Sequence, residues 1–233
     1  MKVREKIKNF WFYYKWHTLI VLFFVIVIAV MAVQHLGREK YDIRILYGGP
    51  AIIGEQTSTE ITNAFKSVLT EDYNKDGEKK VELYDLIIMN SDELKQAYEK
   101  GVSPYFLNED TVADNVELMN FHASVAEYLI YMVDADYYQK LHDNSVFVAL
   151  DVFGVKGGER YDDCAVYLHS LDFAKLYSVF DVFPRDTLIC VKRVQIKDGK
   201  SRAEKLQQNH IEFFKALVEF KLPEEFEAQN GEG

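Results

Sequence analysis

The stretch YDIRILYGGP, residues 41–50, decides the fold class. Asp42 to Tyr47 has the β-branched and aromatic content of a buried strand, and a Gly-Gly-Pro turn ends it. The next run, TSTEITNAFKSVLTE, carries apolar residues at helical spacing, and we expect Ser58 or Thr57 to cap it. A second strand follows at Val81 to Met89. Strand, helix and strand in succession predict a βαβ unit.

Helices and strands continue to alternate downstream. We expect helices in SDELKQAYEKG with Ser91 as cap, in DTVADNVELMNFHASVA, in DADYYQKLH and in SRAEKLQQNHIEFFKALVEF, and strands in EYLIYMV, VFVALDV and TLICVKRVQI. No internal repeat and no low-complexity linker interrupts this order. The sequence therefore predicts one compact α/β domain over residues 41–222 with a mixed or parallel sheet, and a disordered tail over residues 223–233.

A long apolar run lies upstream of this domain. Residues 18–33, TLIVLFFVIVIAVMAV, contain no charge, proline or glycine. With its flanks the segment covers residues 16–36, about the length that crosses a bilayer core. A cleavable signal peptide is the alternative, although its apolar region is normally shorter and no aromatic block such as FWFYYKW normally precedes it. No cysteine follows the run, so a lipoprotein anchor is excluded.

The flanking charges predict the orientation of this helix. Residues 1–15 carry five basic side chains and one acidic side chain, and such flanks stay on the cytoplasmic side. We therefore expect a single-pass protein of the cell membrane with a cytoplasmic N-terminus and an extracellular domain. The first 40 residues hold seven basic and two acidic side chains, which leaves the rest of the chain with a formal charge near −15. This balance excludes nucleic acid as a partner, because nucleic acids require a cationic face.

Two segments of the domain resemble a known family. The order EYLIYMVDADYYQKLHDNSVFVALDV is similar to a segment of type II extracellular solute-binding proteins, and the helix NHIEFFKALVEF resembles one of their helices. With FWFYYKWHTLIVLFF before it, the chain also resembles a group of single-pass proteins of Gram-positive anaerobes. The resemblance implies a reduced type II periplasmic-binding-protein fold. The chain is too short for two full lobes, and it lacks the lipid-anchor cysteine.

The acidic stretch DYNKDGE suggests a calcium site. Asp72, Asn74 and Asp76 fall at positions 1, 3 and 5 of a calcium loop, Gly77 permits the sharp turn, and Glu78 offers its carbonyl. Position 12 is a leucine, so Glu82 or another acid from outside would have to close the site. A solvated turn in which the Asp and Asn side chains cap local backbone is the alternative.

The remaining residues bound the function. No HExxH, GxSxG, CxxC, P-loop or GxGxxG pattern occurs, and the histidines are widely separated, so we expect no enzyme. Cys164 and Cys190 either form a disulfide or lie as buried thiols on neighbouring strands. Two functions remain open. A solute-binding module predicts a pocket at the carboxyl ends of the strands, near Gly48–Pro50 and Val133–Asp136, whereas a non-catalytic envelope scaffold or interaction protein predicts an exposed apolar patch.

Overall fold

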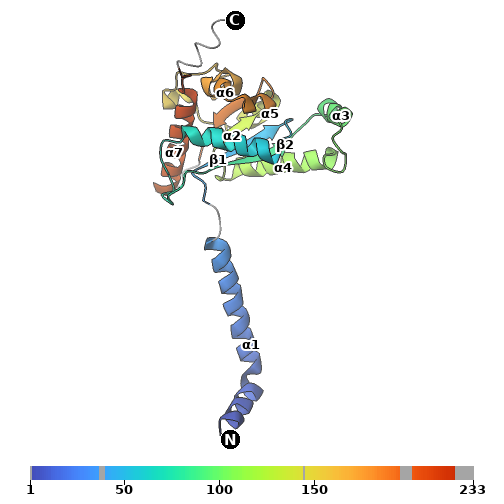
Figure 1. Cartoon of the computed structure of the whole chain (residues 1–233), viewed down its shortest axis with the longest axis vertical. Helices are drawn as coiled ribbons and strands as arrows, with labels where there is room; N and C mark the ends of the chain where they lie inside the picture. Colours follow the sequence, from blue (N-terminus) through green and yellow to red (C-terminus); the bar gives the residue numbers. More distant parts are fainter. Residues whose placement is uncertain (1, 37–39, 144, 195–200, 224–233) are drawn as a thin grey trace. The chain divides into compact units, whose positions relative to one another are not determined.

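The computed structural model describes residues 2–36, 40–143, 145–194 and 201–223 (Figure 1). The chain divides into two compact units, residues 1–40 and residues 41–233. The predicted disordered tail lies outside the described residues except for residue 223.

The first unit is one long helix, α1 (Lys2–Leu36). Within it, Phe10–Met31 forms a 22-residue segment of mean hydropathy 2.1, and none of its most apolar part is buried. A helix that exposes apolar side chains all round requires apolar surroundings. By length and composition α1 is able to cross a membrane, as an anchor or as part of a signal sequence. The segment begins before residue 16 because it includes the aromatic block.

The second unit is built on one mixed five-stranded sheet in the order β2-β1-β3-β5-β4. The strands are β1 (Ile43–Gly49), β2 (Val81–Ile87), β3 (Ile130–Val133), β4 (Ala165–Tyr167) and β5 (Leu188–Val191). Strand β1 is parallel to both of its neighbours, whereas β5 is antiparallel to β3 and to β4. The predicted α/β class with a mixed sheet is confirmed.

Helices cover both faces of this sheet. The described helices of the unit are α2 (Glu55–Val68), α3 (Ser91–Glu99), α4 (Glu109–Ser124), α5 (Ala135–His142), α6 (Asp172–Leu176) and α7 (Ser201–Val218), with 3₁₀ turns at Leu150–Phe153, Leu168–Ser170 and Ser178–Val182. All but α3 contribute to a core on one face of the sheet. Helices α2, α6 and α7 share one apolar core, and α4 and α5 share the other. Figure 1 shows α2 lying along the sheet beside β1 and β2.

Side-chain alternation along the strands produces the two cores. On β1, Ile45 and Tyr47 face the core of α2, and Leu46 faces the core of α4. On β3, Met132 faces the core of α2, and Tyr131 faces the core of α4. Successive side chains of a strand point to opposite faces, and β3 and β5 are apolar throughout because both of their faces are covered. Strand β1 still carries Arg44, and β2 carries Glu82 and Asp85.

Several local expectations require correction. The run VFVALDV forms no strand: Phe147 makes a single bridge to Lys192, and the chain then enters the 3₁₀ turn at Leu150–Phe153. Strand β5 already occupies the free edge of β3, so this run finds no long partner. Helix α3 is capped by Asn90 instead of Ser91, and α2 follows Gly54 without a side-chain cap.

The cysteines follow the second of the two expectations. Both thiols are free and buried. Cys190 lies on β5 opposite Ala165, and Cys164 directly precedes β4. Burial raises the pKa of both thiols, and most strongly that of Cys190.

Candidate functional site

The described part of the second unit contains a cavity of about 500 Å³ where the parallel strands end. Pro50 follows β1, Ile88 follows β2, Asp134 follows β3, and Asp186 precedes the antiparallel β5. We call it the carboxyl-end cavity. Its lining residues are Pro50, Ile88, Met89, Asn90, Glu93, Val116, Asn120, Asp134, Asp136, Tyr137, Lys140, Pro184 and Asp186.

The sheet topology explains the position of this cavity. From β1 the chain passes through α2 on one face to β2, and it returns to the other side of β1 through α4 on the opposite face. In open α/β sheets, such a reversal leaves a crevice outside the carboxyl ends of the strands, where ligands bind. The crevice here lies between β1 and β3, which are linked by the bond from Asp134 N–H to Gly48 O (3.2 Å).

The end of β1 shapes one wall. The strand continues through Gly48 and Gly49, where a turn was expected, and Pro50 follows it. The Tyr47 hydroxyl accepts a hydrogen bond from the backbone N–H of Ala51 at 2.9 Å, so the ring folds back beneath the end of the strand. A Cβ on Gly49 would lie 2.5 Å from this hydroxyl, and a Cβ on Gly48 would lie 2.9 Å from the Met119 methyl group. Position 49 therefore favours glycine strongly, because the Tyr47 ring is held in place, whereas at position 48 the flexible Met119 side chain would have to move. Burial raises the pKa of Tyr47 above its ordinary value.

Four carboxylates and one ammonium group line the cavity. The carboxylates belong to Glu93, Asp134, Asp136 and Asp186, and the ammonium group belongs to Lys140. In the described chain, none of the four carboxylates forms an ion pair. Burial, followed by repulsion from the other three, raises the pKa of Asp134 despite the bond from Tyr137 N–H. The four groups therefore act on one another electrostatically.

Two helices begin at the cavity, and their own side chains cap them. The Asn90 side chain accepts from the N–H groups of Asp92 and Glu93, and the Glu93 carboxylate accepts from Asn90 N–H, which forms a capping box on α3. Asp134 accepts from Tyr137 N–H at 2.7 Å and caps α5. These caps occupy backbone donors that would otherwise attract an anion.

The other walls are apolar or held by hydrogen bonds. Val116 and Asn120 come from α4, and the hydroxyl of Tyr137 donates to the Asn120 side-chain oxygen at 3.0 Å. The Lys140 ammonium group lies over the Tyr137 ring, 5.6 Å from its centroid. The lining thus combines apolar side chains, an aromatic ring held by a hydrogen bond and an excess of negative charge.

The acidic loop, residues 72–78, has an ordered internal geometry. Asp72 accepts hydrogen bonds from the N–H groups of Lys75 and Gly77, both at 2.7 Å. Asn74 and Asp76 each accept from the N–H two residues further on. Gly77 has a φ of +96°, which favours glycine. The bonds to Asp72, foremost the one from Gly77, lower the pKa of its carboxyl.

An acid from outside reaches this loop, and this acid is Asp42 instead of Glu82. Buried Asp42, next to β1, accepts from Asn74 N–H at 2.9 Å and from Lys80 N–H at 2.8 Å. The expected Glu82 pairs with Arg44 at 2.8 Å, and Glu78 pairs with Lys80 at 2.8 Å. Across the described residues, no three or more His, Cys, Asp or Glu side chains are grouped to hold a metal ion.

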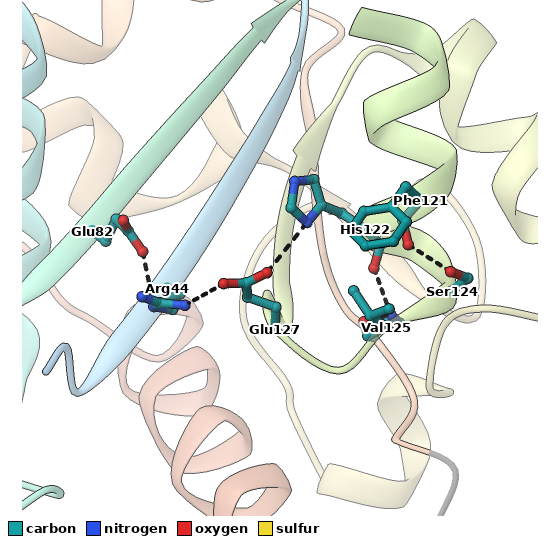
Figure 2. Close-up of polar contacts among 8 residues, drawn as sticks. Arg44, Glu82, Phe121, His122, Ser124, Val125 and Glu127 are labelled. Atoms are coloured by element: carbon teal, nitrogen blue, oxygen red, sulfur yellow. Dashed lines mark hydrogen bonds and ion pairs between the residues drawn. The ribbon is translucent and has the colours of Figure 1, made fainter. Parts of the chain in front are cut away.

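A second polar cluster lies at the opposite, amino-terminal end of the strands. Figure 2 shows Arg44 between Glu82 and Glu127, with His122 beyond Glu127. Both arginine contacts are 2.8 Å long, and the His122–Glu127 contact is 3.7 Å. Burial lowers the pKa of His122. These contacts link β1 and β2 to His122 on α4, and the four residues do not belong to the lining of the carboxyl-end cavity.

Sequence reasoning predicted the place of the cavity near Gly48–Pro50 and Val133–Asp136, but it missed part of the lining. In the sequence, Glu93 looks like an ordinary residue in the first turn of a helix, and Asp186 looks like part of a loop. Their convergence depends on the order of the strands, because antiparallel β5 begins at the edge where β1 to β3 end. Asp42 was likewise read only as the start of a strand.

The chain was compared with known proteins in three ways. No protein-family model, no curated protein and no solved structure matches it. The function therefore has to be argued from the cavity, the loop and the amino-terminal helix themselves.

Proposed function

We propose that this protein is a membrane-anchored extracytoplasmic recognition domain that binds a small solute in the carboxyl-end cavity. The observation that carries the proposal is the cavity itself, which lies at the reversal point of the sheet. Its volume of about 500 Å³ falls within the roughly 300–1,000 Å³ typical of small-molecule sites. The chain would act as a reduced relative of type II extracellular solute-binding proteins, with one lobe in place of two.

The amino-terminal segment supports the anchored and extracytoplasmic part of the proposal. The span Phe10–Met31 is long enough for a bilayer, and basic residues dominate the segment before it. Basic flanks remain in the cytoplasm, so the α/β domain would be outside. In such a location the domain meets solutes before they reach the membrane.

The composition of the lining suits recognition of a solute. The described lining offers carboxylates, an ammonium group, a phenol and amide groups beside apolar side chains, and such polar groups orient a bound solute. Its carboxylates cap helices or lie exposed at the rim. These roles suit a binding site whose polar groups are held in place by the fold.

Calcium would stabilise the domain at the acidic loop. The loop combines carboxylates, an amide and a backbone carbonyl with a glycine at the sharp turn, which is the ligand set of calcium loops. Asp42 joins this loop to the start of β1, so a bound ion would tighten the junction between the loop and the sheet. Without a bidentate glutamate at the last position, the affinity would lie in the roughly 0.1–1 mM range of extracellular modules.

An envelope scaffold is the second candidate function. Between α3 and α4, the Tyr105 side chain is 100% exposed and Phe106 is 62% exposed, and Phe121 on α4 is 56% exposed. Aromatic residues are enriched in protein interfaces. This function requires a protein partner on these residues and no solute in the cavity.

Native mass spectrometry of the full chain, released from neutral detergent micelles, separates the two functions. Val116→Trp places an indole in the cavity, and Ala113→Trp places the same group on an exposed position of α4 as the matched control. Solute binding predicts a small-molecule adduct on the wild type and on Ala113→Trp, lost in Val116→Trp. A bare mass for all three chains would contradict it.

A further inference from the structure

The charge of the carboxyl-end cavity is unbalanced. Four carboxylates face one ammonium group around the lining, and none of the four is ion-paired within the described residues. A concave site lined by one sign of charge focuses the electrostatic potential and concentrates ions of the opposite sign. The cavity therefore attracts cations.

The helix ends at the cavity do not reverse this preference. An anion would normally use the free N–H groups at the starts of α3 and α5. Asn90 and Asp134 already occupy donors at both ends, and Glu93 and Asp136 add negative charge there. An anionic solute would meet repulsion together with donors that are already bonded.

The lining also separates an organic cation from a metal ion. The described residues show no grouping of three or more acidic, histidine or cysteine side chains that could hold a metal ion. The apolar side chains of Pro50, Ile88 and Met89 belong to the same lining as the four carboxylates. A hydrated metal ion would leave this apolar surface without a partner, whereas an ammonium group on an apolar body would use both kinds of surface.

The chain itself supplies an example of such a contact. The Lys140 ammonium group lies over the Tyr137 ring inside this lining. Aromatic faces attract cations through the ring quadrupole. A bound solute would compete with Lys140 for the ring and for the nearby carboxylates.

We infer that the solute is an organic cation, an amine or quaternary ammonium compound with an apolar body, held between Asp134, Asp136 and Asp186 and the Tyr137 ring. This inference rests on the proposed function, because it names the ligand class of the same cavity. It predicts that charge, at constant shape, decides binding.

Three compounds that share one apolar body test this prediction. Phenethylamine is cationic, 2-phenylethanol is neutral and phenylacetate is anionic. Each is titrated into the full chain in neutral detergent micelles and followed by calorimetry, with choline and putrescine as further cations. Phenethylamine is expected to bind at least about tenfold more tightly than its two isosteres, as for a hydrogen bond to a charged group.

Four variants locate the binding. Asp134→Asn keeps the cap of α5 and removes the charge, and it should weaken phenethylamine binding about tenfold or more. Lys140→Met removes the competing ammonium group and should tighten binding up to about fivefold. Asp114→Asn, on an exposed position of α4 outside the lining, is the charge-matched control and should leave the affinity unchanged. Val116→Trp should abolish binding.

The possible outcomes are distinct. Tighter binding of the cations, with these variant effects, supports the inference. If 2-phenylethanol or phenylacetate binds as tightly as phenethylamine or more tightly, and Val116→Trp abolishes this binding, the inference that the solute is a cation is wrong. The cavity would then still be a solute site. The inference fails if no cation binds at concentrations up to about 10 mM, because any weaker dissociation constant would not indicate a specific site. It also fails if calcium is the only cation that binds in the cavity.

Discussion

Lys192 provides a quantitative test of the described core. It follows β5, its side chain is 5% exposed, and its ammonium group donates to the backbone oxygens of His122 and Val125 at the end of α4. Burial lowers the pKa of Lys192 from 10.5 to about 8. The Lys192→Met substitution keeps the length of the side chain and removes the titration.

The sign of the pH dependence follows from this pKa. The unfolded chain holds the Lys192 proton up to a higher pH than the folded chain, so raising the pH removes a charge that is costly only in the fold. The contribution of Lys192 to the free energy of unfolding therefore rises as the pH rises. For folded and unfolded pKa values of about 8 and 10.5, the rise between pH 7 and pH 9 is about 1.3 kcal/mol.

The assay compares the wild type with Lys192→Met by urea unfolding of the full chain at pH 7, 8 and 9. Circular dichroism is the suitable signal, because both tryptophans, Trp11 and Trp16, lie in α1. The thiols of Cys164 and Cys190 have raised pKa values and reduce stability as the pH rises, but they do so equally in both chains. The wild type should therefore gain about 1.3 kcal/mol relative to the variant over this range. Parallel pH profiles would refute the argument that burial disfavours the charged amine.

Four further substitutions test other parts of the structure, and one of them, Phe121→Ala, is a control. Gly49→Ala places a Cβ against the Tyr47 hydroxyl and should lower the free energy of unfolding by about 1–3 kcal/mol in urea titrations; an unchanged value would contradict this close contact. Phe65→Ala removes a fully buried ring stacked on its neighbours and should cost about 3–5 kcal/mol, whereas Phe121→Ala, at an exposed position, should stay within about 0.5 kcal/mol. Asp72→Ala should abolish any rise in melting temperature that millimolar calcium gives the wild type, and a rise that persists would place the ion elsewhere.

The sequence predicts elements whose signals are local. The helical spacing around Ile61 and Phe65 and the helix expected in DADYYQKLH have signals within a few residues, and the structure contains both helices. The Gly-Gly-Pro signal was misplaced as a turn, because β1 continues through Gly48 and Gly49, which pair with β2. The run VFVALDV was misread because a short apolar segment suits a strand and a buried turn equally well. Its outcome depends on β5, which lies some forty residues later and takes the edge of β3.

In the candidate site, too, the residues with local sequence signals were predicted and those that depend on tertiary structure were not. Residues near Gly48 and Asp134 were predicted because ligand sites follow the carboxyl ends of parallel strands. Glu93 and Asp186 come from elements on different sides of the cavity, and no spacing in the sequence relates them. Asp42 reaches the acidic loop from the preceding strand, so its partnership with Asn74 is also a product of tertiary structure.

The most direct test of the central claim is hydrogen–deuterium exchange of the full chain in neutral micelles. Exchange is measured with and without the part of a cell extract below about 1 kDa, because this size limit includes small-molecule ligands. Solute binding predicts slower exchange in the segments that line the cavity, residues 86–93, 116–120 and 134–140, and no such change in Val116→Trp. Unchanged exchange in these segments, or protection confined to the loop that carries Tyr105 and Phe106, would contradict the solute-binding function and favour the scaffold.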